Sequence, residues 1–236
     1  MNILLQILQV FFGYILADFI TGSVHWFEDT YLDYNSNIPF INEIAKHNEL
    51  HHYFPRTIVG YSYIENISTS APFVIAFYVI LFIFFPESLS TYPFFYISLF
   101  IFILFSNVLH RWSHMRECEL PKIIYFLQEK GILLGHKIHK IHHSQDNDNA
   151  YCVNSVYLNY ILDNIGFWRA IENIIYYTTG VKASRKGSFD NYKDIYTDLH
   201  ENTKMDCPKV PTRDEINMLI NLLDNFMTKK NTDTNV

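Results

Sequence analysis

The sequence predicts an all-α integral membrane protein with about three to four membrane helices and a cytosolic helical cap that is rich in histidine. Three observations lead to this fold class. Only 18% of the 236 residues are charged, whereas about 25% is usual in soluble domains. Apolar residues gather in three segments that approach the length of a membrane helix. Ten of the eleven histidines lie in a few short stretches, most of them at helical spacing.

The first membrane helix is expected from about Ile3 past His25. Its apolar part, Ile3 to Ile20, contains one charged residue, Asp18. The segment has neither the basic start nor the small-residue cleavage site of a signal peptide, so we expect it to be a retained helix. An ionisable group inside a membrane is costly and usually paired. For Asp18, a hydrogen bond in helix packing and a functional role are both open.

One face of this helix is formed by residues that follow one another at steps of four, three and four. They are Asp18, Gly22, His25 and Asp29. His25 and Asp29 are one turn apart at the cytosolic end. Asp29 can therefore ligate a metal, or hold His25 in one tautomer from outside the ligand shell. Gly22 is expected to let another helix approach closely.

Two further apolar segments predict a membrane hairpin. Residues 71–85 contain no charge, and this segment reaches membrane length if its helix starts near Ile64. Residues 94–109 contain none either, and this segment reaches that length if its helix continues into the region of His110. The short connection over residues 86–93 has no lysine or arginine.

The basic residues predict the orientation of the chain. None of the 18 lysines and arginines precedes Lys46, and all others follow the first or the third apolar segment. The positive-inside rule places these regions, and with them every group of histidines, on the cytosolic face. The expected membrane is the endoplasmic reticulum in a eukaryote or the inner membrane in a bacterium.

The end of the chain differs from the rest in composition. We expect a membrane domain over residues 1–182 and a polar tail over 183–236, which holds 8 of the 18 basic residues. Thr212 and Glu215 have the spacing of a capping box, and apolar residues then recur at helical spacing. The tail is therefore expected to form one amphipathic helix over about 212–229. We favour docking of this helix on the protein over binding to the membrane surface.

Cysteine spacing and net charge exclude two classes of protein. Cys118, Cys152 and Cys207 lie far apart without a CxxC pair, so a zinc ribbon or a disulfide framework is not expected. On the cytosolic side all three should be reduced thiols. The net charge of −6 and the lack of a basic run argue against nucleic acid as a partner.

Three histidine patterns predict a metal centre with many nitrogen ligands. They are HxxxHH at 47–52, HxxxH at 110–114 and HxxHxxHH at 136–143. Residues three or four apart share one helix face, and neutral imidazole is the commonest metal ligand. One helix cannot aim the adjacent His51 and His52 along one direction. They are therefore expected to serve two metals, or two sides of one centre.

The number of candidate ligands favours two metals. A structural zinc needs four ligands, and this chain offers roughly twice that number. A nitrogen-rich site suits iron, copper or zinc. Iron would bring oxygen chemistry, and the site is expected beside lipid tails. The sequence therefore points to desaturation or hydroxylation of an unactivated C–H bond in an alkyl chain.

Several stretches form a combination of motifs that is very specific. They are ADFITGSVHWFEDT at 17–30, HHYFPRTI at 51–58, NVLHRWSH at 107–114, LQEKGILL with HKIHKIHH across 127–143, YC at 151–152 and LNYILDNIGFWRAIE at 158–172. With these motifs, the chain resembles the plasmanylethanolamine desaturase family, the Kua or CarF type of lipid desaturase. The resemblance covers about residues 14–180.

The resemblance implies a set of ligands for two iron ions, Fe2+/Fe3+, with O2 as co-substrate. The implied metal ligands are His25, His51, His52, His110, His114, His139, His142 and His143. Asp29 belongs to the same motif, and we count it with these eight as catalytic. His47 and His136 fall where the family pattern has no histidine, and His200 has no neighbouring candidate.

The resemblance also implies a reaction. The family removes two hydrogens from C1 and C2 of the alkyl chain of an ether phospholipid and so makes the vinyl ether of a plasmalogen. The reaction uses O2 and two electrons, usually from cytochrome b5. The chain has no GxGxxG or other nucleotide fingerprint. The electrons are therefore expected from a separate protein, cytochrome b5 or a similar donor.

Departures from the family pattern leave the substrate open. Gly60 and Tyr61 stand where the pattern has an arginine and a histidine, and Val156 stands where it has a glycine. One alternative is desaturation of the acyl chain of a phospholipid such as phosphatidylglycerol, and another is lipid hydroxylation. A metal-binding membrane protein without enzymatic activity is disfavoured because the second and third apolar segments lack the polar residues of a transport path.

Overall fold

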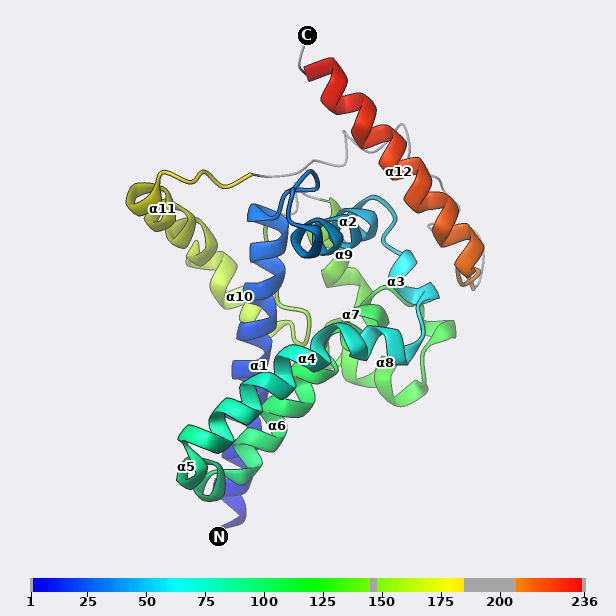
Figure 1. Ribbon diagram of the computed structural model, residues 1–236. Helices are drawn as coiled ribbons and strands as arrows, with labels where there is room; N and C mark the ends of the chain where they lie inside the picture. Colours follow the sequence, from blue (N-terminus) through cyan, green and yellow to red (C-terminus); the bar gives the residue numbers. More distant parts are fainter. Residues whose placement is uncertain (1, 145–147, 185–206, 235–236) are drawn as a thin grey trace.

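The structure of the chain is a computed structural model that describes residues 2–144, 148–184 and 207–234. All regular elements in these residues are helical, as the sequence predicted (Figure 1). They are α1 (Ile3–Tyr31), α2 (Pro39–Tyr53), α3 (Thr57–Gly60), α4 (Tyr63–Phe84), α5 (Pro86–Thr91), α6 (Pro93–Leu104), α7 (Ser106–Ser113), a 3-10 turn (Glu117–Glu119), α8 (Lys122–Glu129), α9 (His136–Ser144), α10 (Tyr157–Asn164), α11 (Phe167–Thr179) and α12 (Arg213–Thr234).

The lower part of the molecule in Figure 1 is the membrane part, where α6 packs along both α1 and α4. Of the described helices, α1 and α4 are each long and apolar enough to cross a membrane. The pair α6–α7 forms a third candidate, whose two halves bend by 52°. With this bent pair counted as one span, the number agrees with the three crossings that the sequence predicted.

Small residues hold α1 and α6 close together. A methyl group at Gly13 would overlap the carbonyl oxygen of Phe95. One turn further along α6, the Ser98 hydroxyl donates a hydrogen bond of 2.8 Å to the carbonyl oxygen of Val10. Close backbone approach and hydrogen bonds between helices are the main attractions available in lipid, where the hydrophobic effect is absent.

The third predicted membrane helix is interrupted rather than continuous. Phe105, with φ −94° and ψ 6°, separates α6 from α7. After the bend, α7 points toward α9 and presents His110, and His114 follows directly at its C-terminal end. The bend therefore turns the end of a membrane segment into a wall of the histidine-rich region.

The buried carboxylate in α1 has a packing role. Asp18 accepts hydrogen bonds from the backbone amide of Asn154 at 2.8 Å, and from the amide and hydroxyl of Ser155 at 3.1 and 2.6 Å. Gly22, on the same face, admits this loop rather than a helix, because a methyl group there would lie 2.6 Å from Cys152 Sγ. The loop between α9 and α10 is thus fastened to α1 at two levels.

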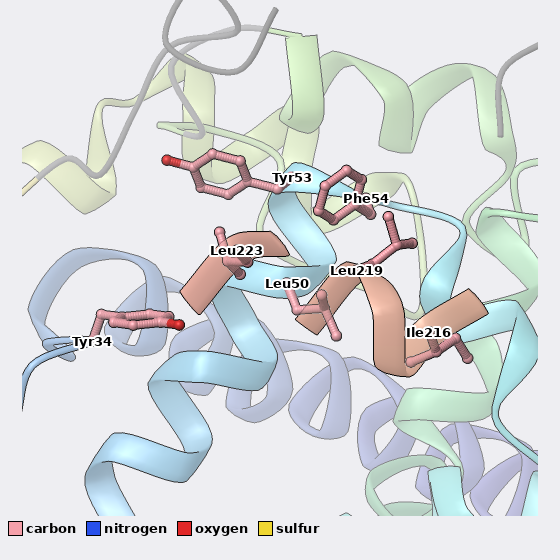
Figure 2. Close-up of a cluster of buried hydrophobic side chains, with 7 residues drawn as sticks. All are labelled: Tyr34, Leu50, Tyr53, Phe54, Ile216, Leu219 and Leu223. Atoms are coloured by element: carbon pink, nitrogen blue, oxygen red, sulfur yellow. The ribbon is translucent and has the colours of Figure 1, made fainter. Parts of the chain in front are cut away.

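The tail helix α12 docks on the outer side of α2, as its amphipathic pattern predicted (Figure 2). The buried cluster between them consists of Tyr34, Leu50, Tyr53, Phe54, Ile216, Leu219 and Leu223. The expected capping box is formed: the Thr212 amide donates to Glu215 Oε2 at 2.7 Å, and the Glu215 amide donates to Thr212 Oγ1 at 3.3 Å. The helix runs to Thr234, further than the sequence indicated.

Two departures from the family pattern lie against this tail. A methyl group at Gly60 would lie 2.5 Å from the carbonyl oxygen of Pro211 and 2.7 Å from Ile216 Cδ1. The guanidinium of Arg213 lies 4.7 Å from the ring centroid of Tyr61. The close approach of the tail explains the glycine at position 60, because a larger residue there would displace the tail.

The expectation that all three cysteines are reduced thiols is wrong for Cys118 and Cys207. Cys118 and Cys207 form a disulfide with a Cα–Cα distance of 5.8 Å, which ties the tail to the segment after α7. The two cysteines are 89 residues apart in sequence, so no local spacing could indicate that they pair. Cys152 is a free thiol, buried against Gly22.

Candidate metal centre

Side chains from α1, α2, α7 and α9 converge in two groups above the membrane part. In each group, one ligand atom from every residue lies within 4.8 Å of the others. The five-histidine group consists of His51, His110, His114, His139 and His143. The Asp29 group consists of His25, Asp29, His52 and His142. All eight histidines implied by the resemblance, together with Asp29, therefore belong to one group or the other.

Two helices supply both groups, and the spacing of their histidines decides the division. On α2, the adjacent His51 and His52 point in different directions, and each enters a different group. On α9, His139 and His143 are one turn apart and enter the five-histidine group together. His142 turns away from them toward α1. Each group is therefore assembled from three helices, and neither can form without α2 and α9.

The five-histidine group brings ring nitrogens into direct proximity. His110 Nε2 and His139 Nε2 lie 2.8 Å apart, and His143 Nε2 lies 3.1 Å from the same His139 atom. The rings of His51 and His114 close the group, with centroids 4.6 Å apart. Burial first, and the neighbouring imidazoles second, lower the pKa of His51, His114, His139 and His143 well below the ordinary histidine value. These rings are therefore neutral at physiological pH, with lone pairs available to a cation.

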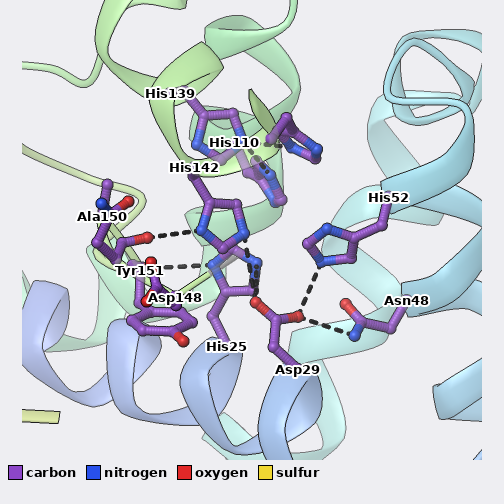
Figure 3. Close-up of polar contacts among 12 residues, drawn as sticks. His25, Asp29, Asn48, His52, His110, His139, His142, Asp148, Ala150 and Tyr151 are labelled. Atoms are coloured by element: carbon purple, nitrogen blue, oxygen red, sulfur yellow. Dashed lines mark hydrogen bonds and ion pairs between the residues drawn. The ribbon is translucent and has the colours of Figure 1, made fainter. Parts of the chain in front are cut away.

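The Asp29 group is organised around a buried carboxylate (Figure 3). Asp29 Oδ1 lies 2.8 Å from His52 Nε2, and Oδ2 lies 3.2 Å from His142 Nε2 and 3.5 Å from His25 Nε2. The side-chain amide of Asn48, one turn before His52, donates a hydrogen bond of 2.9 Å to Oδ1. The carboxylate thus joins three imidazoles that come from three helices.

Backbone carbonyls orient two rings of the Asp29 group. His25 Nδ1 donates to the carbonyl oxygen of Tyr151 at 3.0 Å, and His142 Nδ1 donates to that of Asn149 at 2.7 Å. With Nδ1 protonated, Nε2 carries the lone pair and faces Asp29. An outer hydrogen bond of this kind is the usual way in which proteins fix the tautomer of a metal-ligating histidine.

The two groups share a wall. The ring centroids of His52 and His143 are 5.0 Å apart, and those of His25 and His110 are 5.3 Å apart. Each of these pairs contains one member of either group. The arrangement is therefore one centre with two neighbouring sites rather than two distant sites.

The donor set fits metal ions. Among the described residues, neither ring nitrogen of His51 has a hydrogen-bond partner, nor has Nε2 of His114, although all three atoms are buried. Buried polar atoms without partners cost free energy, and native structures contain few of them. Cations held between the rings would satisfy these atoms. Imidazole nitrogens with a single carboxylate suit iron, copper or zinc. Magnesium and calcium prefer oxygen ligands, so this set of donors does not suit them.

Two further histidines among the described residues, His47 and His136, take no part in the two groups. His47 is exposed on α2, with its Nε2 3.1 Å from Glu43 Oε1. His136 opens α9, with its Nδ1 3.2 Å from the carbonyl oxygen of Ser113. His200 lies outside the described residues. Both described side chains therefore lie outside the two groups.

Sequence reasoning missed Arg56, a buried side chain that connects the ligand-bearing segments. Its guanidinium forms two hydrogen bonds with the carboxylate of Glu119, at 2.9 and 2.7 Å. It also donates to the carbonyl oxygen of His114 at 3.1 Å and to that of Lys209 at 3.3 Å. The signal was available, because Arg56 follows His51 and His52 within the motif HHYFPRTI. Only the fold shows that it fixes the backbone of His114.

Comparison with known proteins gives a family and several relatives. A family model described as a lipid desaturase domain matches residues 14–186. A probable fatty acid desaturase of Acanthamoeba polyphaga mimivirus is 32% identical over 190 residues, which are 79% of this chain and 90% of that protein. Plasmanylethanolamine desaturase 1 of Mus musculus is 35% identical over 192 residues, 75% of this chain and 68% of that protein. The chloroplastic fatty acid desaturase 4 of Arabidopsis thaliana is 33% identical over 174 residues, 72% and 51% of the two chains. No solved structure matches.

Proposed function

Since the chain belongs to the lipid desaturase family, we propose that it is a two-iron desaturase that acts on plasmanylethanolamine. The reaction places a double bond between C1 and C2 of the ether-linked alkyl chain, which gives a plasmalogen. One observation is the main support for this proposal: eight histidines and Asp29 converge into two adjacent groups at the end of membrane helices. Such a site lies where the first carbons of a membrane lipid can reach it.

Each group would hold one iron ion. The five-histidine group supplies nitrogen ligands only, and the Asp29 group supplies three nitrogens and one carboxylate. Iron bound there supplies the activation of O2 that removal of hydrogen from an unactivated C–H bond requires. The protein's own contribution is to bind the ions, orient them and keep the surroundings dry.

The residues of the chain perform these tasks in separable ways. The backbone carbonyls of Tyr151 and Asn149 keep His25 and His142 in the tautomer that binds metal. The amide of Asn48 holds the carboxylate of Asp29 in place. Burial of every member of the Asp29 group excludes bulk water from this side of the centre, so that electrons and oxygen are not lost to side reactions.

The balance of the reaction requires a donor protein. One CH2–CH2 unit, one O2, two electrons and two protons give one CH=CH unit and two molecules of water. We assign the two electrons to cytochrome b5 or a similar carrier that docks on the cytosolic side. The side is inferred from the basic residues, none of which precedes Lys46 or lies in the 86–93 connection.

The relatives support one alternative substrate. The mouse relative is named for plasmanylethanolamine, whereas the mimivirus and Arabidopsis relatives are named as fatty acid desaturases. Desaturation of the acyl chain of a phospholipid such as phosphatidylglycerol is therefore the second candidate. Both candidates use the same iron ligands and differ in the lipid that is bound.

Lipid analysis tests the proposal directly. The chain is expressed in cells that lack plasmalogens and are fed an alkylglycerol, and vinyl ethers are measured in the lipid extract. The double variant His110→Ala/His139→Ala is the inactive control, and His47→Ala, which changes a histidine outside both groups, is the matched active control. We expect vinyl ethers with the parent and with His47→Ala only. A new acyl double bond without vinyl ether would favour the second candidate, and no new double bond with stable protein would refute desaturation.

A further inference from the structure

Helices α10 and α11 expose a surface that contains no charge. Every residue from 157 to 181 is described, and none of the exposed side chains in this range is acidic or basic. Large apolar and aromatic side chains dominate it, and the most exposed are Tyr157, Tyr160, Ile165, Ile174 and Tyr177. We call these five residues, with their exposed neighbours in 157–181, the α10–α11 surface.

The charged residues of these two helices all have partners within the protein, although Arg169 remains 34% exposed. Asp163 accepts a hydrogen bond of 3.0 Å from the amide of Ala150. Arg169 pairs with Glu172 at 2.7 Å, and Glu172 also accepts a hydrogen bond of 3.0 Å from the indole of Trp26 on α1. A helix that faces water normally shows the reverse, with its charges on the outer face.

The tail helix α12 has the pattern of a helix that faces water, unlike α10 and α11. On α12 the inner face is apolar and buried against α2, and the exposed positions include Arg213, Asp214, Asn217 and Asn221. The outer face of α12 is therefore suited to water. The α10–α11 surface, by its composition, is suited to lipid.

Contacts with α1 give the level of α10 and α11 relative to the membrane. Phe167, at the start of α11, packs on Phe19 of α1 with ring centroids 5.6 Å apart. Beyond the end of α11, the amide of Ser184 donates to the carbonyl oxygen of Thr30 at 2.9 Å. From Phe19 to Thr30, α1 rises by about 16 Å at the usual 1.5 Å per residue. Helix α11 therefore begins beside the upper part of the α1 membrane segment, and the chain returns to the end of α1 after the helix has ended.

The exposed surface of α1 is apolar over the same levels. Val24 and Phe27 remain 52% and 49% exposed, and both face outward from a helix that is long enough to cross a membrane. Exposed apolar side chains thus occur on α1 at the same levels as on α10 and α11. Tyrosines on the α10–α11 surface, such as Tyr160 and Tyr177, are typical of the boundary between lipid tails and head groups.

We propose that the α10–α11 surface is embedded in the lipid leaflet beside the metal centre, with α11 rising from the acyl chains at Ile165 toward the head groups at Tyr177. Neither helix spans the membrane. Together they form an interfacial element of the kind that amphipathic helices build on membranes. The consequence is that His25 and Asp29, near the end of α1, lie level with the boundary of that leaflet. This inference concerns membrane contact and goes beyond the proposed reaction.

Depth-dependent quenching tests the inference without substrate turnover. Cys118 and Cys207 are replaced by serine and the buried Cys152 by alanine, and single cysteines are introduced by Ile165→Cys, Tyr177→Cys and, as the control on α12, Asn221→Cys. Each full-length variant is labelled with an environment-sensitive fluorophore and reconstituted into phosphatidylcholine vesicles. One quencher is phosphatidylcholine with a nitroxide in the middle of an acyl chain, and the other is a water-soluble nitroxide.

We expect the lipid nitroxide to quench the label at position 165 several times more than the label at 221, with the label at 177 between them. The water-soluble nitroxide should give the reverse order. Equal quenching from water at all three positions would overturn the inference. Protection of positions 165 and 177 from both quenchers would also overturn it, because a protein contact, such as a second copy of the chain, would then cover the surface. A reaction other than desaturation would leave these results unchanged.

Discussion

The five-histidine group and the Asp29 group lie side by side, yet they differ in how their polar atoms are satisfied. In the Asp29 group, a carboxylate faces three imidazoles and backbone carbonyls accept hydrogen bonds from two of the rings, although Nε2 of His25 and of His142 lack a hydrogen-bond partner among the described residues. In the five-histidine group, nitrogens face nitrogens, and both ring atoms of the buried His51 are without a hydrogen-bond partner among the described residues. Both arrangements leave nitrogen lone pairs that cations could satisfy, but only the Asp29 group contains a carboxylate among its candidate ligands.

The comparison indicates that the two proposed iron sites would be unequal. A carboxylate in the ligand set lowers the net charge of one site and leaves the other as a cation surrounded by neutral rings. We expect the ion of the Asp29 group to bind more tightly and that of the five-histidine group to be more exchangeable. Because α2 and α9 supply both groups, damage to either helix should affect both sites, and damage to a single side chain should affect one.

The largest loss of activity is expected for His139→Ala, which removes the ring that lies beside both His110 and His143. The Asp29 group keeps all of its members, so the variant should retain about half of the parent iron. Activity should fall by more than the roughly 10–100-fold typical of residues that only support ligands. Iron per chain and product formation are measured together. Loss of all the iron would show that the groups are not separable sites.

The second-largest loss of activity is expected for Asp29→Asn, which keeps the shape of the side chain and removes its charge. Iron should be lost from the Asp29 group first, and activity should fall by about 10–100-fold. A titration with an iron chelator measures the order of loss in the variant and in the parent. Asp214→Asn, an exposed change on α12, is the matched control. Retention of both irons with full activity would contradict the role given to Asp29.

A smaller effect is expected for Asp18→Asn, which acts on the Asp29 group from a distance. The amide NH2 would oppose the donors at one of the two oxygen positions, either the Asn154 amide or the amide and hydroxyl of Ser155. The loop with the carbonyls of Tyr151 and Asn149 would therefore loosen. We expect a loss of about 1–3 kcal/mol in the free energy of unfolding and of about tenfold in activity. Iron spectra should change for the Asp29 site alone. Equal perturbation of both sites would mean a general loss of packing.

The smallest effect on activity is expected for Leu219→Ala, which thins the contact between α12 and α2. Burial of Leu219 predicts a loss of about 2–5 kcal/mol in the free energy of unfolding, without preference for either site because α2 serves both. Leu222→Ala, on the exposed side of the same helix, is the control and should be close to neutral. Thermal denaturation and iron content give the readouts. Selective loss of iron from one site would show that α12 acts on a single group.

Much of the fold follows from patterns that are local in sequence. Apolar length predicted the membrane helices, and the capping box and spacing from Thr212 predicted α12. The adjacent pair His51 and His52 also predicted a divided centre, since neighbouring residues on a helix point in different directions. These features depend on one segment at a time, and the structure reproduces them.

Features that depend on two distant segments could not be predicted. The disulfide between Cys118 and Cys207 joins parts of the chain 89 residues apart. Gly22 was expected to admit a helix, but it admits the loop at Cys152, because a glycine indicates close approach without indicating the partner. The bend at Phe105 joins α6, which packs on α1, to α7, which packs on α4 and α9, and no single segment specifies both sets of contacts.

Iron analysis by Mössbauer spectroscopy tests the central claim most directly. The chain is purified from cells grown with 57Fe, and iron per chain and the number of distinct iron environments are measured for the parent and for His139→Ala. The account predicts two irons in two unequal environments in the parent, and only the Asp29-site signal in the variant. One iron per chain, or two irons in identical environments, would contradict it.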